Sequence, residues 1–287
     1  MRNLILINVD ETILNNYAQQ TAFGLREKIR QIQRANNVDV GLNDDSSQAT
    51  LTKLGKRLGC HGVCVAERGQ EIFVFSSQAH QVIWSDKKSQ DFVTQLRKHL
   101  VAFLKSRITK KRSRYLEGEI SSLVENMIDS EDPRSCYILD ASRNHSLLCS
   151  FLEYDRNEEA WLVSTDEMQS LIHNWCHHLH SIDLEKKYQE NQDLKFDFGH
   201  KFEYLLIHTN EAEKARAITK IKELNWYGQI FMIGSSAQDW LGKDVIHCAV
   251  ANANDFGRYK SNCNYVSQSP LTLGVIECLD WIIKQKT

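Results

Sequence analysis

The residues best placed to carry out chemistry follow a short aliphatic run near the start of the chain. Residues 4–7 are four consecutive aliphatic residues, and Asn8, Asp10 and Thr12 come soon after them. A run of this length is too short for a membrane span and is typical of a strand buried on both faces of a parallel sheet. Such a strand delivers the residues that follow it to the carboxyl edge of the sheet, where open α/β folds bind their ligands.

Four further motifs occur later in the chain. They are Val-Ala-Glu-Arg-Gly-Gln-Glu-Ile at 65–72, Glu-Lys-Ala-Arg-Ala-Ile at 213–218, Gly-Ser-Ser-Ala-Gln-Asp at 234–239, and Ala-Val-Ala-Asn-Ala at 249–253 with Lys260 and Tyr265-Val266 behind it. Each motif is weak alone. In this order and spacing, together with residues 8–12, they resemble the motifs of the haloacid dehalogenase (HAD) phosphatases, and in particular those of the Cof-type, sugar-phosphatase-like branch.

Hydrophobic periodicity divides the chain into three stretches. Up to residue 84 the predicted elements alternate, with helices over 15–36 and 48–58, strands over 38–42 and 63–65, and a hairpin over 71–84. Residues 85–208 mix helices at 88–106, 115–128 and 165–180 with strands at 136–139, 146–154, 160–163, 194–198 and 202–207. Alternation resumes after 209, with helices at 211–224 and 271–284 and strands at 229–233 and 245–249. Alternating elements with short loops are typical of a doubly wound sheet.

We therefore expect an α/β fold with an inserted domain. The resemblance implies the same architecture, which is a HAD-like doubly wound parallel sheet core formed by 1–84 and 209–287, with an inserted α+β cap domain at 85–208. In this branch of the family the cap closes over the carboxyl edge of the sheet and selects the substrate, typically a sugar phosphate.

The resemblance also implies roles for individual residues. In the family a carboxylate at the end of the first strand attacks phosphorus, and the carboxylate two residues later protonates the leaving oxygen. Asn8 stands at the position of that nucleophile and Asp10 at the position of the acid/base. Lys214 matches the lysine that binds the phosphoryl oxygens, where electrostatic stabilisation is largest. The catalytic roles therefore fall on Asn8, Asp10 and Lys214.

The phosphate and the metal involve further residues. By resemblance, the phosphate-binding residues are Thr12, Asp44, Ser46, Lys214 and Asn252. The Mg²⁺ of the family, a hard ion that prefers oxygen ligands, would be held by Asp10, Ser235 and Asp239.

Arg68 and Gln238 each stand where the family pattern has asparagine, and three further departures bear on the chemistry. Asn8 replaces the nucleophilic aspartate, and its amide neither attacks phosphorus readily nor offers negative charge to a metal ion. Ser235 replaces the metal-binding aspartate, so both anionic ligands are missing and the Mg²⁺ site is expected to be weak or absent. Asp44 stands where the second motif has threonine or serine, and a carboxylate there would repel phosphate. A single engineered substitution at Asn8 would explain one departure but not three.

Two functions stay open at this point. The departures favour a HAD-like pseudoenzyme, impaired as a phosphatase, that binds a phosphorylated or sugar-like small molecule or a protein partner without turning it over. The alternative is an active phosphomonoesterase that acts on a sugar phosphate through a rewired site, with Asp10 and either Asp44 or Asp45 in the lost roles.

The charges of Lys214 and Asp44 oppose each other at the expected anion pocket. At an effective dielectric constant near 20, one unit charge at ~4 Å contributes about 4 kcal/mol, so the two side chains would roughly cancel. Backbone N–H groups of the turn after Asn8 should then decide the outcome. We expect weak anion binding at this pocket, in the millimolar range.

Composition and local patterns argue against several other partners. The net charge of −2 gives no global reason to expect a nucleic acid or a membrane. The basic run at 105–114 lacks interleaved aromatic residues, which favours a solvated helix end over a nucleic-acid contact. His173 and His177 share a face of a predicted helix, but no glutamate follows the first as in HExxH, so we expect a surface histidine cluster rather than a zinc site.

The cysteines bear on the compartment. The chain has eight, scattered and mostly inside apolar strand or helix patterns, which predicts buried free thiols. Met1 leads straight into the first strand, with no signal peptide before it. Both observations favour a cytoplasmic protein.

Overall fold

The first strand, β1 (Arg2–Ile7), lies inside a sheet of five strands in which all neighbours run parallel. The order is β14-β13-β12-β1-β2, and the other bounds are Tyr265–Val266 for β14, Ile246–Ala249 for β13, Tyr227–Gly234 for β12 and Val38–Leu42 for β2. The four aliphatic residues at 4–7 have no exposed surface. The prediction of a parallel strand buried on both faces is therefore confirmed.

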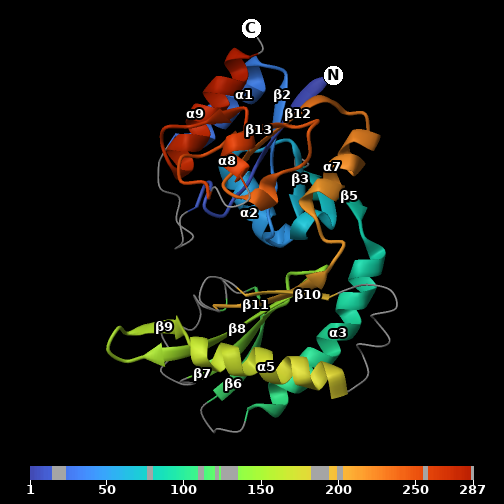
Figure 1. The fold of residues 1–287 in the computed structure, drawn as a ribbon, viewed down its shortest axis with the longest axis vertical. Coiled ribbons are helices and arrows are strands. Elements are labelled where there is room, and N and C mark those ends of the chain that lie inside the picture. Colours follow the sequence, from blue (N-terminus) through green and yellow to red (C-terminus); the bar gives the residue numbers. More distant parts are fainter. Residues whose placement is uncertain are drawn as a thin grey trace. The chain divides into compact units, whose positions relative to one another are not determined.

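Figure 1 shows this fold in the computed structural model. The structure describes residues 1–14, 24–75, 80–108, 113–119, 123, 135–181, 194–198, 203–254 and 258–285.

Helices cover both faces of the parallel sheet (Figure 1). They are α1 (Leu25–Ala35), α2 (Gln48–Leu58), α7 (Lys214–Glu223), the short α8 (Tyr259–Asn262) and α9 (Leu271–Lys284). Ile5 and Ile7 belong to one hydrophobic cluster with residues of α1, α2 and α9. Leu4 and Leu6 belong to another, with residues of α7. Because neighbouring residues of a strand point to opposite faces, α7 lies on the other side of the sheet from α1 and α9. The predicted doubly wound α/β fold is confirmed.

A small antiparallel sheet extends the parallel one beyond β2. It has the order β3-β4-β5, with the bounds Val63–Ala66, Glu71–Phe75 and His80–Ser85, and β4 and β5 pair as the predicted hairpin. A parallel bridge between Asn43 and Val65 sets β3 beside β2. The short helix η1 (Glu67–Gly69) joins β3 to β4.

The chain divides into two compact units. One consists of Met1–Ser85 and Ala212–Thr287, and the other is the segment Asp86–Glu211 between them. The sequence predicted these boundaries after residue 84 and before residue 209, which is one residue and three residues earlier than the structure places them. We call these the core unit and the inserted unit.

The inserted unit is an α+β structure. Its sheet has the order β10-β11-β8-β7-β6, with β9 paired to β8, and only β6 and β7 are parallel. The strands are β6 (Ser113–Gly118), β7 (Ser135–Asp140), β8 (Ser146–Asp155), β9 (Ala160–Val163), β10 (Leu194–Phe198) and β11 (Leu205–Thr209). Helices α3 (Lys87–Ser106) and α5 (Thr165–Ser181) share a hydrophobic cluster with it, which contains the buried Trp175.

Three predicted elements need correction. The helix expected over 115–128 begins instead as strand β6, because Tyr115 pairs with Tyr137 of β7 and packs on the hydrophobic cluster. Such sheet contacts override local spacing. The helix expected over 15–36 begins at Leu25, where Gly24 has a left-handed φ of 95°. Residues 15–23 and most of 120–130 lie outside the described residues. The strand expected over 202–207 is Leu205–Thr209.

The cysteines agree with the sequence prediction. All eight are free, and six of them are buried. Burial raises the pKa of Cys64 to about 12, so this thiol stays protonated and packs as an apolar group. Among the described helices, none combines the length and the apolar composition that crossing a membrane requires.

A buried histidine makes part of the core unit sensitive to acid. His247 in β13 has no exposed surface, its Nε2 accepts a hydrogen bond from the Leu241 N–H at 3.0 Å, and its ring stacks on Trp240 at 4.1 Å. Burial lowers the pKa of His247 from 6.5 to about 4. Below pH 6.5 the unfolded chain therefore takes up a proton that the folded chain does not, and stability falls until about pH 4.

We expect His247→Gln to flatten this acid dependence. A glutamine Oε1 can accept the same hydrogen bond but does not titrate. Melting temperatures of both proteins, measured from pH 7 to pH 4, should fall more steeply for the wild type. Equal slopes for the two proteins would contradict the role given to His247.

Candidate active site

The predicted site residues gather where the parallel strands end. Asn8 follows β1, Ser235 follows β12, and Asp44 lies two residues beyond β2. Because these strands are parallel, their carboxyl ends share one edge of the sheet. Lys214 reaches this edge from the first position of α7.

Asn8 is buried and uses both ends of its side-chain amide. Its Oδ1 accepts from Lys214 Nζ at 2.9 Å. Its Nδ2 donates to the backbone oxygen of Asp10 at 2.8 Å and to Thr12 Oγ1 at 3.3 Å. An ionised aspartate could take the first bond but not donate the others. The site is thus matched to the amide.

Lys214 is a buried cation held by carboxylates. Its Nζ donates to Asp239 Oδ1 at 2.9 Å and lies 3.7 Å from Asp45 Oδ1. Burial alone would lower the pKa of Lys214, but the charges of Asp239, Asp45 and Asp44 together raise it above its ordinary value. The ammonium group therefore stays charged. It also lies at a helix N-terminus, where a cation is unfavourable, so these carboxylates are needed.

Asp239 is fully buried at the end of the short helix η3 (Ala237–Asp239). Its Oδ2 accepts from the N–H groups of Ser235 and Ser236 at 2.9 and 3.1 Å, while Oδ1 takes the lysine. A Cβ on Gly234 would lie 2.5 Å from the Asp239 side chain, so only glycine allows this approach. Both carboxylate oxygens are engaged by the protein itself.

The backbone oxygen of Asp10 receives two donors. Ser235 Oγ donates to it at 3.2 Å, in addition to the Asn8 amide. Asn8 and Ser235 therefore point hydrogens at the same oxygen. The Asp10 side chain is exposed.

Asp44 does not act as a free repelling charge. It is 1% exposed, and its Oδ2 accepts from the N–H groups of Val9 and Asp10, both at 3.2 Å. Its Oδ1 accepts from the N–H and the hydroxyl of Ser46 at 2.9 and 2.6 Å. These two N–H groups, which were expected to bind an external anion, thus bind Asp44 instead.

The remaining phosphate-binding candidates contact the chain itself. Thr12 is buried and accepts a hydrogen bond from the Asn8 amide, and the Ser46 hydroxyl donates to Asp44. Asn252 donates to the backbone oxygen of Glu11 and accepts from the Leu271 N–H, both at 2.8 Å. It therefore ties the turn after β1 to the start of α9.

Sequence reasoning missed one ion pair at the site. Arg68 Nε donates to Asp45 Oδ2 at 2.9 Å. Glu67, Arg68 and Gly69 all have left-handed φ angles of 46°, 57° and 85°, and a Cβ on Gly69 would lie 2.4 Å from the Glu213 oxygen. This turn packs against the start of α7. The motif at 65–72 marked the turn, but not which carboxylate Arg68 would meet.

Comparison with known proteins bears on the fold. No protein-family model and no curated protein sequence matches the chain. Solved structures match almost all of it. A HAD-like hydrolase from Bacteroides thetaiotaomicron has a TM-score of 0.62 at 14% identity, over 98% of this chain and 100% of that one. This chain has the haloacid dehalogenase-like fold.

Two further structures agree with the HAD-like fold. TM0651 from Thermotoga maritima has a TM-score of 0.62 at 14% identity, over 98% of this chain and 97% of its own. A trehalose-6-phosphate phosphatase related protein has a TM-score of 0.57 at 13% identity, over 99% of this chain and 100% of its own. At such identities the likeness concerns the fold, and the fold prediction is confirmed.

Two surface features raised by the sequence lie in the inserted unit. Arg107, in the basic run, pairs with Glu167 at 2.6 Å, and residues 109–112 lie outside the described part. The exposed His173 and His177 place their ring centres 4.8 Å apart. Among the described residues, no group of three or more His, Cys, Asp or Glu side chains is arranged to hold a metal ion.

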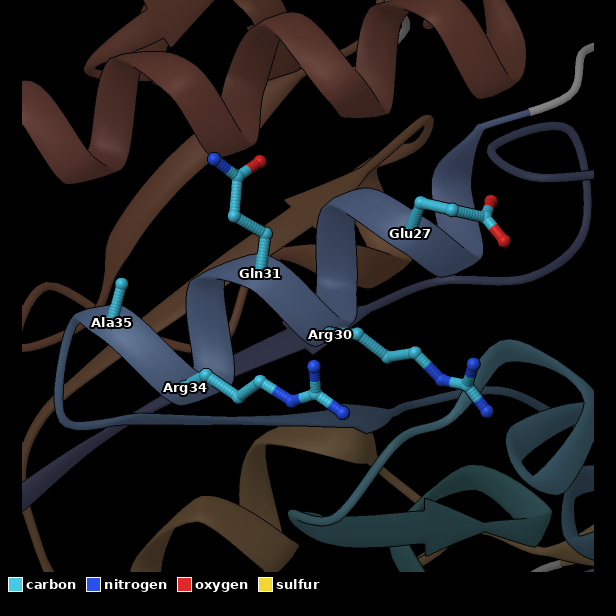
Figure 2. Close-up of a pocket in the computed structure, with 5 residues that line it drawn as sticks. All are labelled: Glu27, Arg30, Gln31, Arg34 and Ala35. Atoms are coloured by element: carbon cyan, nitrogen blue, oxygen red, sulfur yellow. The ribbon is translucent and has the colours of Figure 1, made fainter.

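A cavity of about 600 Å³ runs along α1, lined by Glu27, Arg30, Gln31, Arg34 and Ala35 (Figure 2). Figure 2 shows Arg30 and Arg34 extending on the same side of the helix. A neighbouring cavity of about 390 Å³ adds Arg2 and His61, close to the starts of β1 and β3. The candidate site residues line neither of these two cavities.

We expect Lys214→Met to destabilise the core unit by about 3–5 kcal/mol, because it leaves Asp239 buried without its cation. Lys220→Met is the matched control, since Lys220 pairs with Glu223 at 2.9 Å on the exposed face of the same helix. The control should cost less than about 1 kcal/mol. Urea denaturation would measure both. Adding Asp239→Asn to Lys214→Met should recover part of the loss, and equal costs for the two lysines would refute this account.

Proposed function

We propose that this chain is a HAD-superfamily protein of the Cof-type branch that has lost phosphomonoesterase chemistry and acts by binding a ligand or a protein partner. The fold and the five ordered motifs support the family. Similar structures include a HAD-like hydrolase and a trehalose-6-phosphate phosphatase related protein, so phosphate ester hydrolysis is the ancestral activity that we infer.

The observation that carries the proposal is the state of Asn8. Attack on phosphorus needs an oxygen with an available lone pair and negative charge. The Asn8 oxygen is neutral and accepts from the Lys214 ammonium, while its nitrogen is committed as a donor to Asp10 and Thr12. No carboxylate stands at this position to form a phosphoryl-enzyme.

The residues that would face Mg²⁺ do not fit that ion. Mg²⁺ demands oxygen lone pairs in a near-octahedral arrangement. Here the Asn8 amide and the Ser235 hydroxyl direct hydrogens toward the Asp10 backbone oxygen, and both oxygens of Asp239 accept hydrogen bonds, from Lys214 and from two backbone N–H groups. Donors of the chain itself thus face the oxygen atoms that would have to hold a cation.

The rewired phosphatase has less support. Asp44 is buried and accepts four hydrogen bonds, and Asp45 faces both Arg68 and Lys214. Neither carboxylate is placed to take over nucleophile or metal duty without dismantling these contacts. Asp10 alone would supply an acid/base without a nucleophile.

The direct test is turnover. With p-nitrophenyl phosphate and Mg²⁺, the wild-type chain should release p-nitrophenol at the rate of a buffer control. Asp10→Asn and Asp91→Asn, the latter an exposed carboxylate of α3 in the inserted unit, are the paired variants. A Mg²⁺-dependent rate that Asp10→Asn abolishes and Asp91→Asn preserves would sink the proposal and promote the rewired site.

A second test concerns the ion itself. Asn8→Asp with Ser235→Asp would place carboxylate oxygens where donors now face the Asp10 backbone oxygen. The two carboxylates and the Asp10 backbone oxygen would repel one another unless a cation lay between them. The double variant should therefore melt at a higher temperature when Mg²⁺ is added, and the wild type should not, with NaCl of equal ionic strength as the control. Saturable Mg²⁺ stabilisation of the wild type would count against the proposal.

A further inference from the structure

We propose that Asp44 is a built-in anion that fills the phosphate position at this edge of the sheet, so that the site excludes phosphate and any ligand it takes is not a phosphate ester. This inference rests on the proposed loss of turnover and concerns the same site. It replaces the millimolar anion binding expected from the sequence.

The first step is the direction of two backbone N–H groups. Those of Val9 and Asp10, consecutive in the turn after Asn8, both donate to Asp44 Oδ2 at 3.2 Å. Successive N–H groups that converge on one point form an anion-binding concavity. An external phosphate oxygen would need that same point, which a carboxylate oxygen of the chain already occupies.

The second step is that Asp44 is firmly held in this place. Its other oxygen accepts from the N–H and hydroxyl of Ser46, and the side chain is 1% exposed. The Asp44 N–H itself donates to the Val65 oxygen at 3.1 Å, which fixes the backbone from which the carboxylate extends. A buried carboxylate that accepts hydrogen bonds from four donors is held in one place.

The third step concerns the cation that would otherwise attract phosphate. Lys214 donates to Asn8 and Asp239 and lies near Asp45, so its charge is balanced within the protein. A phosphate at this site would therefore meet Asp44 while the charge of Lys214 is already balanced by the chain. At an effective dielectric constant near 20, one like charge at ~4 Å lowers the affinity for phosphate by roughly a thousandfold.

Asp44→Ser tests the inference, because serine frees the two N–H groups and removes the charge. Asp45→Asn is the matched control, since it removes an equal charge beside Lys214 but touches neither N–H group. Inorganic phosphate is titrated without metal into the ¹⁵N-labelled wild type and both variants, and the amide signals of Val9 and Asp10 are followed.

We expect no saturable shift of these two signals in the wild type or in Asp45→Asn up to about 50 mM phosphate. Asp44→Ser should bind with a dissociation constant of a few millimolar or tighter, at least tenfold below that limit. The inference would be overturned if the two variants gained equal affinity for phosphate, or if a folded Asp44→Ser variant gained none.

The wild-type titration decides by itself if Asp44→Ser fails to fold. Shifts of Val9 and Asp10 with phosphate would refute the built-in anion, and their absence would support it. The result is also separable from the test of function. A wild type that binds phosphate without hydrolysing p-nitrophenyl phosphate overturns only this inference, whereas a wild type that hydrolyses it overturns the proposed function.

Discussion

One buried ammonium group organises the sheet edge of this protein. Lys214 joins the residue after β1 to Asp239, which in turn holds the residues after β12 through their backbone N–H groups. A charge at this depth persists only where opposite charge and hydrogen bonds surround it. Asp239, Asp45 and Asp44 supply the opposite charge, and Asn8 and Asp239 accept the hydrogen bonds. The charge and the hydrogen bonds of the lysine are therefore matched by groups of the chain itself.

The same principle accounts for the residues at three positions where the chain differs from the motifs it resembles. Asn8 and Ser235 both donate to the backbone oxygen of Asp10, and the Asp44 carboxylate accepts from the N–H groups of Val9 and Asp10. Each substitution satisfies a polar group that the fold leaves at this edge, and buried polar groups are costly when unpaired. The donors and acceptors of these residues are thus paired with one another in one hydrogen-bond network.

Much of this was accessible from the sequence. Four aliphatic residues identified β1, and the order of the motifs placed Lys214 and Asp239 near Asn8. The direction of each side chain was not accessible. Charge alone made Asp44 a repelling neighbour, whereas its rotamer and the two N–H groups of the turn make it an internal ligand. Likewise, the Arg68–Asp45 pair depends on a left-handed turn, and β6 depends on a partner strand. Such features are set by contacts distant in sequence.

The position of β1 has a consequence for synthesis of the chain. Arg2 pairs with Tyr227, so β1 receives one of its two partner strands only after 225 further residues have left the ribosome. The inserted unit, by contrast, is one continuous segment and has its own hydrophobic cluster. The strands of the inserted unit can therefore all be present before β1 has both of its neighbours, and residues 4–7 lack the partner strand β12 during that interval. Chaperone demand should accordingly fall on the first strand of the nascent chain, and truncations that remove β12 should aggregate through it.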